Sequence, residues 1–195
     1  MSDPTVQPVP ASVVEQVDAA DATLSNPKRA VVSLGSNLGN RLETLQGAID
    51  ALEDTPGVRV KAVSPVYETE PWGVDPGSQP SYFNAVVVLK TTLPPVSLLE
   101  RGQAIEEAFD RVREERWGPR TIDVDIVTYA DVESDDPALT LPHPRAHQRA
   151  FVLAPWLEVD PEAQLPGHGP VAGLLQGVGQ SGVHARTDLE LRLPE

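Results

Sequence analysis

The segment IDVDI at positions 122–126 is the feature that most constrains the fold of this chain, because apolar residues alternate strictly with aspartates. Side chains two residues apart in a β-strand point to the same face of the sheet. The three apolar residues therefore point toward a core, and Asp123 and Asp125 point together to the opposite face. A strand of this kind needs neighbouring strands beside it and a layer that covers its apolar face.

The rest of the chain supplies these elements in a definite order. The predicted strands are residues 29–34, 58–66, 82–91 and 121–129, and the predicted helices are residues 40–52 and 94–109. This β-α-β-β-α-β order indicates an α+β fold with a ferredoxin-like core, in which an antiparallel sheet carries its helices on one face. The connections 68–81 and 110–120 are expected to be long active-site loops.

A length of 195 residues fits one ordinary domain with tails. Residues 1–27 are rich in Pro, Ala and Asp, and we expect a mobile N-terminal tail there. The folded domain is expected over residues 28–170, and residues 171–195 are expected to form a C-terminal extension with an edge strand at residues 189–193. The candidate functional residues named below all fall within residues 28–170.

The charge and the ends of the chain limit the classes of partner. A formal net charge of −14 disfavours binding to nucleic acid and to anionic membranes. The chain has no cysteine, no run of 18 apolar residues, and no signal-peptide pattern at its N-terminus. We therefore expect a cytoplasmic monomer that acts on small molecules, without nucleic-acid or membrane partners.

The arginines are concentrated in one region, with six of twelve between positions 111 and 149. A guanidinium group matches the paired oxygens of a phosphate, so this cluster is compatible with a phosphate site. It is equally compatible with ordinary ion pairs to the neighbouring glutamates, and the composition alone favours that second interpretation.

The two aspartates of the alternating strand provide a more specific signal. Two carboxylates forced side by side repel each other, and a hard cation such as Mg²⁺ removes that repulsion. A solvated pair of acids is the simpler explanation of an isolated Asp-X-Asp. Here the loop RWGPR at positions 116–120 leads directly into the strand and adds arginines and an aromatic ring. Carboxylates for metal, arginines for phosphate and a ring for a base together indicate nucleotide-dependent phosphoryl transfer.

Five segments occur in an order that resembles a known family. They are SLGSNLGNR, SPVYETEPWG, YFNAVVVL, ERWGPRTIDVDIV and LPHPRAHQRAFVLAPWLEV, and they cover roughly residues 29–165. This pattern resembles the 6-hydroxymethyl-7,8-dihydropterin pyrophosphokinases of folate biosynthesis. The resemblance, and not the physics of the sequence, implies the pterin substrate, ATP as co-substrate, and direct transfer of diphosphate with release of AMP.

The resemblance also implies roles for individual residues. Asp123 and Asp125 are the expected ligands of two magnesium ions that hold the triphosphate. The expected catalytic residues are Arg111, Arg113, Arg120, Asp123 and Asp125. The expected nucleotide-binding residues are Gln103, Glu106, Arg113, Trp117, His143 and Arg149, and the expected pterin-binding residues are Thr69, Trp72, Tyr82, Asn84 and Phe151.

Two other classes of protein share parts of this pattern. A metal-dependent nucleotidyltransferase or phosphoryltransferase on a ferredoxin-like fold would also carry Asp-X-Asp and arginines, but a nucleotidyltransferase would release pyrophosphate instead of AMP. A ferredoxin-like module that senses amino acids or binds RNA would need no catalytic groups. An RNA-binding sheet is expected to be basic and aromatic, which the charge of −14 and the acidic strand face argue against.

Overall fold

The computed structural model describes residues 26–71, 75–110 and 121–195. Its strands are β1 (Lys28–Ser36), β2 (Val58–Val63), β3 (Tyr67–Thr69), β4 (Tyr82–Thr91), β5 (Asp123–Tyr129), β6 (Gln164–Leu165), β7 (Gly169–Pro170) and β8 (Val183–Ala185). Its α-helices are α2 (Arg41–Glu53), α3 (Pro95–Asp110), α4 (Ala150–Val159) and α5 (Val171–Val178), and η1 (Ala146–Gln148) is a short 3-10 helix. The predicted N-terminal tail lies outside the described residues, apart from residues 26 and 27.

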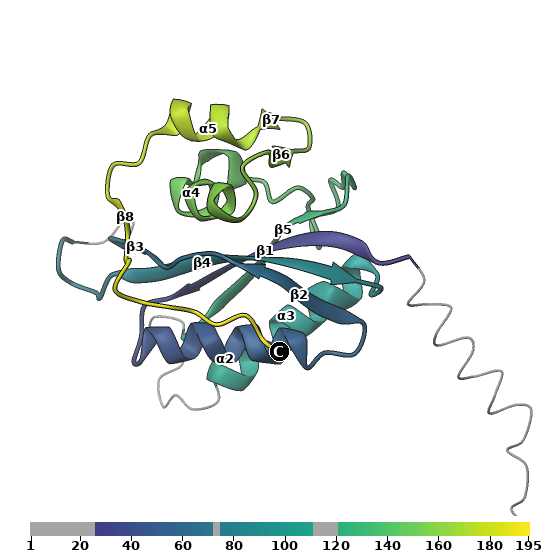
Figure 1. Cartoon of the computed structure of the whole chain (residues 1–195), viewed down its shortest axis with the longest axis horizontal. Coiled ribbons are helices and arrows are strands. Elements are labelled where there is room, and N and C mark those ends of the chain that lie inside the picture. The colour runs from purple at the N-terminus through teal and green to yellow at the C-terminus, as the bar shows by residue number, and fades with distance from the viewer. Residues whose placement is uncertain (1–25, 72–74, 111–120) are drawn as a thin grey trace, which may run out of the picture.

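The main sheet confirms the ferredoxin-like core. Its strands lie in the order β5-β1-β4-β3-β8, and β2 also pairs with β4, beyond the end of β3. Every pair in this sheet is antiparallel. Strands β1, β2, β4 and β5 correspond to the four predicted strands. Strand β3 follows β2 in the chain and pairs with the same neighbouring strand, β4. Figure 1 shows this sheet as the central layer of the molecule.

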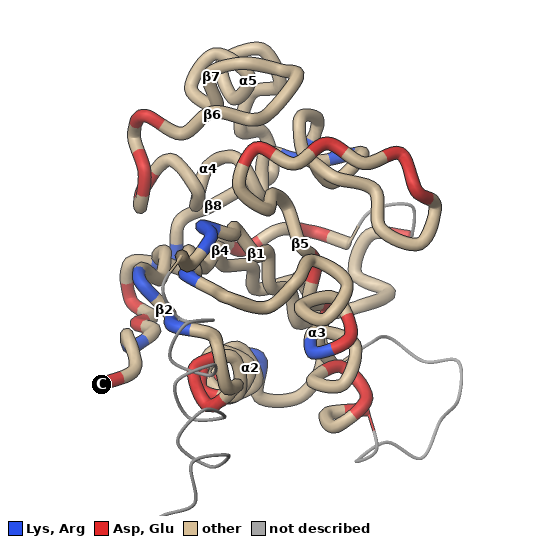
Figure 2. The backbone as a smooth tube through the Cα atoms, turned by 90° about the vertical axis from the view of Figure 1, so that its right-hand side faces the viewer, with Lys and Arg blue, Asp and Glu red and all other residues tan. Residues whose placement is uncertain are grey.

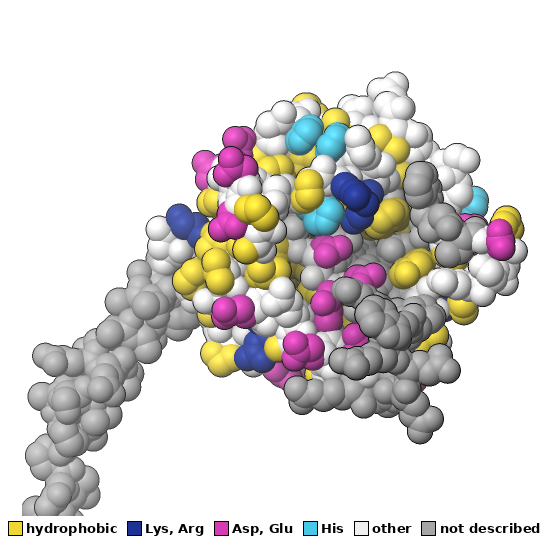
Figure 3. Space-filling view, turned by 180° about the vertical axis from the view of Figure 1, so that it is seen from behind, with side chains coloured by type: hydrophobic (Ala, Val, Ile, Leu, Met, Phe, Trp, Pro, Cys, Tyr) yellow, Lys and Arg dark blue, Asp and Glu magenta, His cyan; other side chains and the backbone are white. Residues whose placement is uncertain are grey.

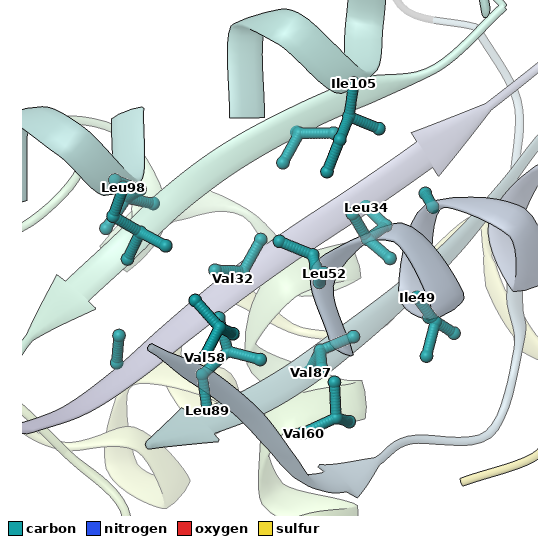
Figure 4. Close-up of a cluster of buried hydrophobic side chains, with 14 of the residues drawn as sticks. Val32, Leu34, Ile49, Leu52, Val58, Val60, Val87, Leu89, Leu98 and Ile105 are labelled. Atoms are coloured by element: carbon teal, nitrogen blue, oxygen red, sulfur yellow. The ribbon is translucent and has the colours of Figure 1, made fainter. Parts of the chain in front are cut away.

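Helices α2 and α3 cover one face of the sheet, as the sequence pattern predicts. Asn40 begins α2, and its side-chain oxygen accepts a hydrogen bond from the backbone N–H of Glu43 at 3.3 Å. The apolar side chains of α2 and α3 pack against alternate residues of the strands, as Figure 4 shows for fourteen of the buried side chains. The apolar residues of IDVDI, at positions 122, 124 and 126, belong to this core, so the predicted orientation of this strand is confirmed.

The predicted placement of helices on one face holds for α2 and α3, but two further helices lie on the other face. Helices α4 and α5 cover the opposite face, where they pack with Val31, Val86 and Val127. The physical reason is visible in β4, where the consecutive residues 85–89 are all apolar and all buried. A strand that is apolar on both faces needs a covering layer on both sides.

The C-terminal segment also differs from the expectation. The extension does contribute an edge strand to the main sheet, but this strand is β8, which pairs with β3, and residues 189–193 form no strand. Leu189 and Leu191 pack on the core beside α2, so their period-two spacing reflects contact with that core and not pairing in a sheet. Figure 1 shows this last segment running from β8 back across the molecule to α2. No helix within the described residues is long and apolar enough to cross a membrane.

Candidate active site

One row of paired residues runs across the sheet and positions the candidate site. Gly35 on β1 is the register partner of Asp123 on β5 and of Asn84 on β4, and Asn84 is the partner of Tyr67 on β3. Residues directly opposite each other in a sheet share a face. Asp123 and Asn84 therefore lie on the same face with Gly35 between them, about 10 Å apart, because each strand spacing is ~4.8 Å.

A cleft of about 1070 Å³ opens over this row, beside the start of α4. Its lining residues are Ser33, Gly35, Thr69, Glu70, Pro71, Gln79, Tyr82, Asn84, Asp123, Asp125, His143, Arg145, Gln148, Arg149, Ala150, Phe151, Val178, Gly179, Ser181, Gly182 and Val183. Figure 3, which views the molecule from behind, shows basic, histidine and acidic side chains gathered close together on one face. The cleft therefore combines charges of both signs with aromatic and amide groups.

The acidic end of the cleft consists of Asp123 and Asp125, which point to one face of β5 as predicted. The Asp125 side chain is 44% exposed, and its Oδ2 lies 3.9 Å from Nη1 of Arg149. Arg149 precedes α4 and also lies over the ring of Phe151, with 5.5 Å between the guanidinium carbon and the ring centroid. This arginine therefore connects the carboxylates to the aromatic part of the cleft.

His143 stands beside these charges. Its backbone N–H donates to the carbonyl of Val127 at 2.8 Å, and its Nδ1 accepts from the backbone N–H of Arg145 at 3.1 Å. The neutral ring therefore carries its proton on Nε2. Burial lowers the pKa of His143 below its ordinary value of 6.5, and the nearby Arg149 and Arg145 lower it further, whereas Asp125 opposes this shift. The ring is thus a neutral hydrogen-bonding group near pH 7.

At the opposite end of the cleft, the central group is a buried, uncharged amide. Asn84 is 3% exposed, and its Nδ2 donates to Thr69 Oγ1 at 2.9 Å and to the carbonyl of Tyr67 at 3.2 Å. These two bonds fix the plane of the amide. A Cβ atom on Gly35 would lie 3.3 Å from Asn84 Oδ1 and 3.7 Å from the ring of Tyr82, so glycine leaves room for both groups. Such a fixed amide can recognise the edge of a polar heterocycle.

Eight of the predicted residues meet in this cleft, namely Thr69, Tyr82, Asn84, Asp123, Asp125, His143, Arg149 and Phe151. Gln103 and Glu106 do not line it. Both lie on α3, and Oε1 of Glu106 accepts a hydrogen bond from the backbone N–H of Val124 at 2.8 Å, at the outer edge of β5. Their contact with a nucleotide stays a prediction. The remaining predicted residues, Trp72, Arg111, Arg113, Trp117 and Arg120, lie outside the described residues.

Sequence reasoning missed other residues of the cleft. Ser33 and Gly35 alternate with the buried Val32 and Leu34, so the same period-two argument that was applied to β5 would have placed them on the cleft face. Five residues between positions 178 and 183 also line the cleft, but they carry no comparable signal, because a strand pairing between distant segments brings them there.

The described residues hold no cluster of three or more His, Cys, Asp or Glu arranged to bind a metal ion. Two carboxylates side by side still suit Mg²⁺, which commonly takes one or two protein carboxylates and completes its shell with water and substrate phosphates.

Figure 2 shows acidic residues distributed over α2, α3 and the outer loops, with basic residues in smaller numbers. Arg145 and Arg149 therefore supply positive charge at the cleft within a protein of net charge −14.

Comparison with known proteins agrees with this geometry. The model of the family described as 7,8-dihydro-6-hydroxymethylpterin-pyrophosphokinase (HPPK) matches residues 31–161. A 2-amino-4-hydroxy-6-hydroxymethyldihydropteridine pyrophosphokinase from Methylorubrum extorquens is 45% identical over 139 residues, covering 71% of this chain and 87% of that protein. The enzyme of the same name from Mycobacterium leprae is 47% identical over 161 residues, covering 77% of this chain and 79% of that protein.

Solved structures support the fold. A triple mutant of Plasmodium falciparum HPPK-DHPS with pteroate matches with a TM-score of 0.62 at 16% identity, over 84% of this chain and 48% of that chain. The wild-type protein from the same organism matches with a TM-score of 0.59 at 16% identity, over 80% of this chain and 42% of that chain. The chain thus spans about half the length of these structures or less. From its sequence match and its fold, the chain belongs to the 7,8-dihydro-6-hydroxymethylpterin-pyrophosphokinase family.

Proposed function

We propose that this chain transfers the terminal diphosphate of ATP to the hydroxyl of 6-hydroxymethyl-7,8-dihydropterin and releases AMP, a reaction of folate biosynthesis. The observation that carries the proposal is the single row Asp123–Gly35–Asn84 across one sheet face. It brings a pair of carboxylates and a fixed amide to two ends of one cleft, with space for a small acceptor between them.

The pterin binds at the Asn84 end. A pterin ring presents donors and acceptors on one edge, and the buried amide of Asn84 faces the cleft at a fixed angle because Thr69 and Tyr67 hold it. Tyr82 and Phe151 line the same part of the cleft and provide aromatic faces for the flat ring. The hydroxymethyl group of the pterin then points along the row toward the aspartates.

The triphosphate of ATP binds at the Asp123 and Asp125 end. Two Mg²⁺ ions fit the donor set there, because each aspartate offers an oxygen to the cleft and the phosphates supply further oxygens. Bound metal would supply the positive charge that stabilises the phosphate oxygens during transfer. Arg149 and His143 bind the nucleotide on the same side, as guanidinium and neutral imidazole donors. The family roles of Gln103, Glu106, Arg111, Arg113, Trp117 and Arg120 on the nucleotide side, and of Trp72 on the pterin side, are part of this proposal.

The transfer is a direct substitution at phosphorus. A bond forms between the pterin hydroxyl oxygen and the β-phosphorus, and the bond from that phosphorus to the oxygen it shares with the α-phosphorus breaks. AMP leaves with that bridging oxygen, and the hydroxyl proton is released. This chain contributes by holding the two substrates in line and by placing charges around the phosphates, which are the main sources of rate in phosphoryl transfer. We further propose that the protein works as a monomer in the cytoplasm.

Product analysis tests the proposal. The protein is incubated with ATP, Mg²⁺ and 6-hydroxymethyl-7,8-dihydropterin, and the products are separated, identified by mass spectrometry and quantified. We expect AMP and the pterin diphosphate in equal amounts, and no product without the pterin or without Mg²⁺. Release of pyrophosphate with a nucleotidylated pterin would favour the nucleotidyltransferase alternative. Asp125→Asn serves as the inactive control, and Asp131→Asn, on the exposed loop after β5, serves as the matched acidic control.

A further inference from the structure

The segment of residues 178–188, called here the C-terminal strap, lies beyond residue 161, where the match to the family model ends. Its strand β8 adds to the sheet beside β3, with Val183 opposite Thr69 and Ala185 opposite Tyr67. Five residues of the strap line the cleft, namely Val178, Gly179, Ser181, Gly182 and Val183. Val178 is 44% exposed and lines the cleft, so its apolar side chain is accessible to a ligand there.

The strap is also bonded to the framework behind the cleft. Glu68 is the middle residue of β3, so it points to the sheet face opposite Thr69 and Tyr67. Nη1 of Arg186 donates to Oε2 of Glu68 at 2.7 Å, and the backbone N–H of Arg186 donates to the carbonyl of Val66 at 2.8 Å. Asp188 accepts from Nε and Nη2 of the same guanidinium at 2.8 and 2.7 Å, which fixes its plane.

Glu68 joins the strap to the far end of the connection between β3 and β4. The hydroxyl of Ser81, the last residue before β4, donates to Oε1 of Glu68. Arg41 of α2 donates to the carbonyl and the hydroxyl of Ser81 at 2.7 and 2.8 Å. The guanidinium groups of Arg41 and Arg186 both lie over the ring of Phe83, at 3.7 and 5.3 Å from its centroid. One cluster therefore fixes residues on both sides of this connection.

The residues that follow the strap anchor it. The backbone N–H of Arg192 donates to Oε1 of Gln46 at 2.8 Å, and Nε2 of Gln46 donates to the carbonyl of Arg192 at 3.1 Å. Leu189 and Leu191 pack on the core beside this pair. The strap is thus held at both ends, by the α2 contact after it and by α5 before it.

We propose that the C-terminal strap is part of the pterin site: its five cleft-lining residues form one of the walls, and Arg186 is a positioning residue that holds Glu68 and, through it, Thr69 and Ser81. The inference rests on the proposed function, because it names the substrate on which the strap acts. Its physical basis is adjacency, since Thr69 and Tyr82 lie in the same cross-strand row as Val183. A shift of β3 would move the hydroxyl of Thr69, which accepts a hydrogen bond from Asn84 and so orients its amide.

The Arg186 variants test the positioning role. Arg186→Ala is expected to raise the KM for the pterin roughly fivefold to tenfold, a modest factor because the ion pair is partly exposed, and to leave the KM for ATP close to wild type. Arg186→Lys keeps the positive charge but not the planar guanidinium with its paired donors. Its KM for the pterin should therefore lie between those of the wild type and Arg186→Ala. Arg192→Ala is the matched control, because the bonds of Arg192 to Gln46 use its backbone atoms. An unchanged pterin KM in Arg186→Ala, or equal rises in both KM values, would overturn this role. If Arg186→Ala does not fold, Arg186→Lys is judged by the same criterion.

A second pair of variants tests the wall. Ser181→Trp fills part of the cleft and is expected to raise the KM for the pterin at least about tenfold, by steric exclusion from a pocket that must fit a flat ring. Gln180→Trp places the same bulk on the adjacent exposed residue, which does not line the cleft, and should change little. A normal pterin KM in Ser181→Trp, or a defect confined to ATP, would show that this wall does not face the pterin.

The wild-type protein separates the two levels of the proposal. If it does not form the pterin diphosphate from ATP, the proposed function fails before the strap is tested. If it forms the product and the Arg186 and Ser181 variants match it, the function stands and the inference about the strap fails.

Discussion

The two ends of the cleft are built in different ways. At the end proposed to bind the pterin, called here the pterin end, Asn84 is buried and its amide donates to two fixed acceptors, Thr69 Oγ1 and the Tyr67 carbonyl. At the end proposed to bind the phosphates, called here the phosphate end, Asp125 is 44% exposed, and Arg149 approaches it only to 3.9 Å. The first end is held by hydrogen bonds between two strands, β4 and β3, whereas the pair of Asp125 and Arg149 at the second end is long and partly exposed.

This difference indicates how each end recognises its ligand. A buried amide whose two N–H groups are both bonded can occupy one orientation before the ligand arrives, so little ordering is needed on binding. Carboxylates on one strand face repel each other and gain most from a bound cation, so under the proposed function this end would depend on metal and nucleotide to complete it. Substitutions at the pterin end should therefore affect binding and folding together, whereas substitutions at the phosphate end should affect turnover without loss of stability.

The largest effect is expected from the aspartates. Asp123→Ala or Asp125→Ala removes one oxygen ligand and should lower kcat by at least ~10²-fold, the scale of one lost electrostatic stabiliser. The melting temperature should hold or rise, because the substitution also relieves repulsion between the two carboxylates. Turnover and melting are measured on each variant with Asp131→Ala as the control. Near-normal turnover with unchanged Mg²⁺ dependence would contradict the assignment.

Asn84→Ala should have the next largest effect. It leaves Thr69 Oγ1 and the Tyr67 carbonyl without their donor inside the sheet, which costs about 1–3 kcal/mol of stability. The KM for the pterin should rise with it, and the KM for ATP should change little. Thr69→Ser, which retains the accepting hydroxyl, is the control in the same steady-state and melting measurements. A normal pterin KM in Asn84→Ala would remove this residue from the pterin site.

Gly35→Ala sharpens the comparison, because Gly35 lies between the two ends. The added methyl would stand 3.3 Å from Asn84 Oδ1, so the amide must shift by a few tenths of an ångström. We expect a loss of about 1 kcal/mol in pterin binding, at the low end of overpacking costs. Gly173→Ala in α5 is the control, since a methyl there meets no other atom within 4 Å. Equal effects of the two substitutions on pterin affinity would argue against a tight fit at Gly35.

The smallest effect concerns pH and the cluster behind the pterin end. Hydrogen bonds from Ser81 and Arg186 hold the pKa of Glu68 below its ordinary value of 4.5, and Arg186 lowers the pKa of Asp188 to about 2. A carboxyl group with a depressed folded-state pKa stabilises the protein above its unfolded-state pKa, and that contribution is lost as the pH falls through the folded-state pKa.

The melting temperature of the wild type should therefore fall more steeply than that of Arg186→Ala when the pH is lowered from about 6 to about 3. The carboxylate of Asp188 is largely exposed to solvent and that of Glu68 is partly exposed, so the difference should be small. Thermal melts of both proteins across this range, with Arg192→Ala as the control, check the expectation. Parallel curves would show that Arg186 does not contribute to these pKa shifts.

Local periodicity in the sequence was sufficient to predict much of the fold. The alternation in β5 and the helical spacing in α2 depend only on neighbouring residues, and both predictions are confirmed. The covered second face was missed, although the continuous apolar run at 85–89 in β4 signals burial on both sides. The spacing of Leu189 and Leu191 resembled a strand, but the edge of β3 pairs with β8 instead.

The candidate site was predictable to the extent that its residues lie in short motifs. The resemblance led to Asn84, Phe151 and the aspartates, and the structure brings them into one cleft. The predicted strand ends at residue 34, one residue before Gly35, although Gly35 lies within β1 and separates the two ends of the site. The position of the strap beside the cleft could not be predicted from the sequence, because it depends on a pairing between β3 and β8, which lie more than a hundred residues apart in the chain.

The central claim is that one sheet face binds two substrates at two separate ends, and calorimetry tests it most directly. A non-hydrolysable ATP analogue with Mg²⁺ is titrated into Asn84→Ala and Asp125→Asn, and the pterin is then titrated into each variant after saturation with the analogue. We expect Asp125→Asn to weaken the analogue and Asn84→Ala to weaken the pterin, each with little effect on the other ligand, because substitutions about 10 Å apart usually act independently. Equal weakening of both ligands by both variants would contradict the two-ended site.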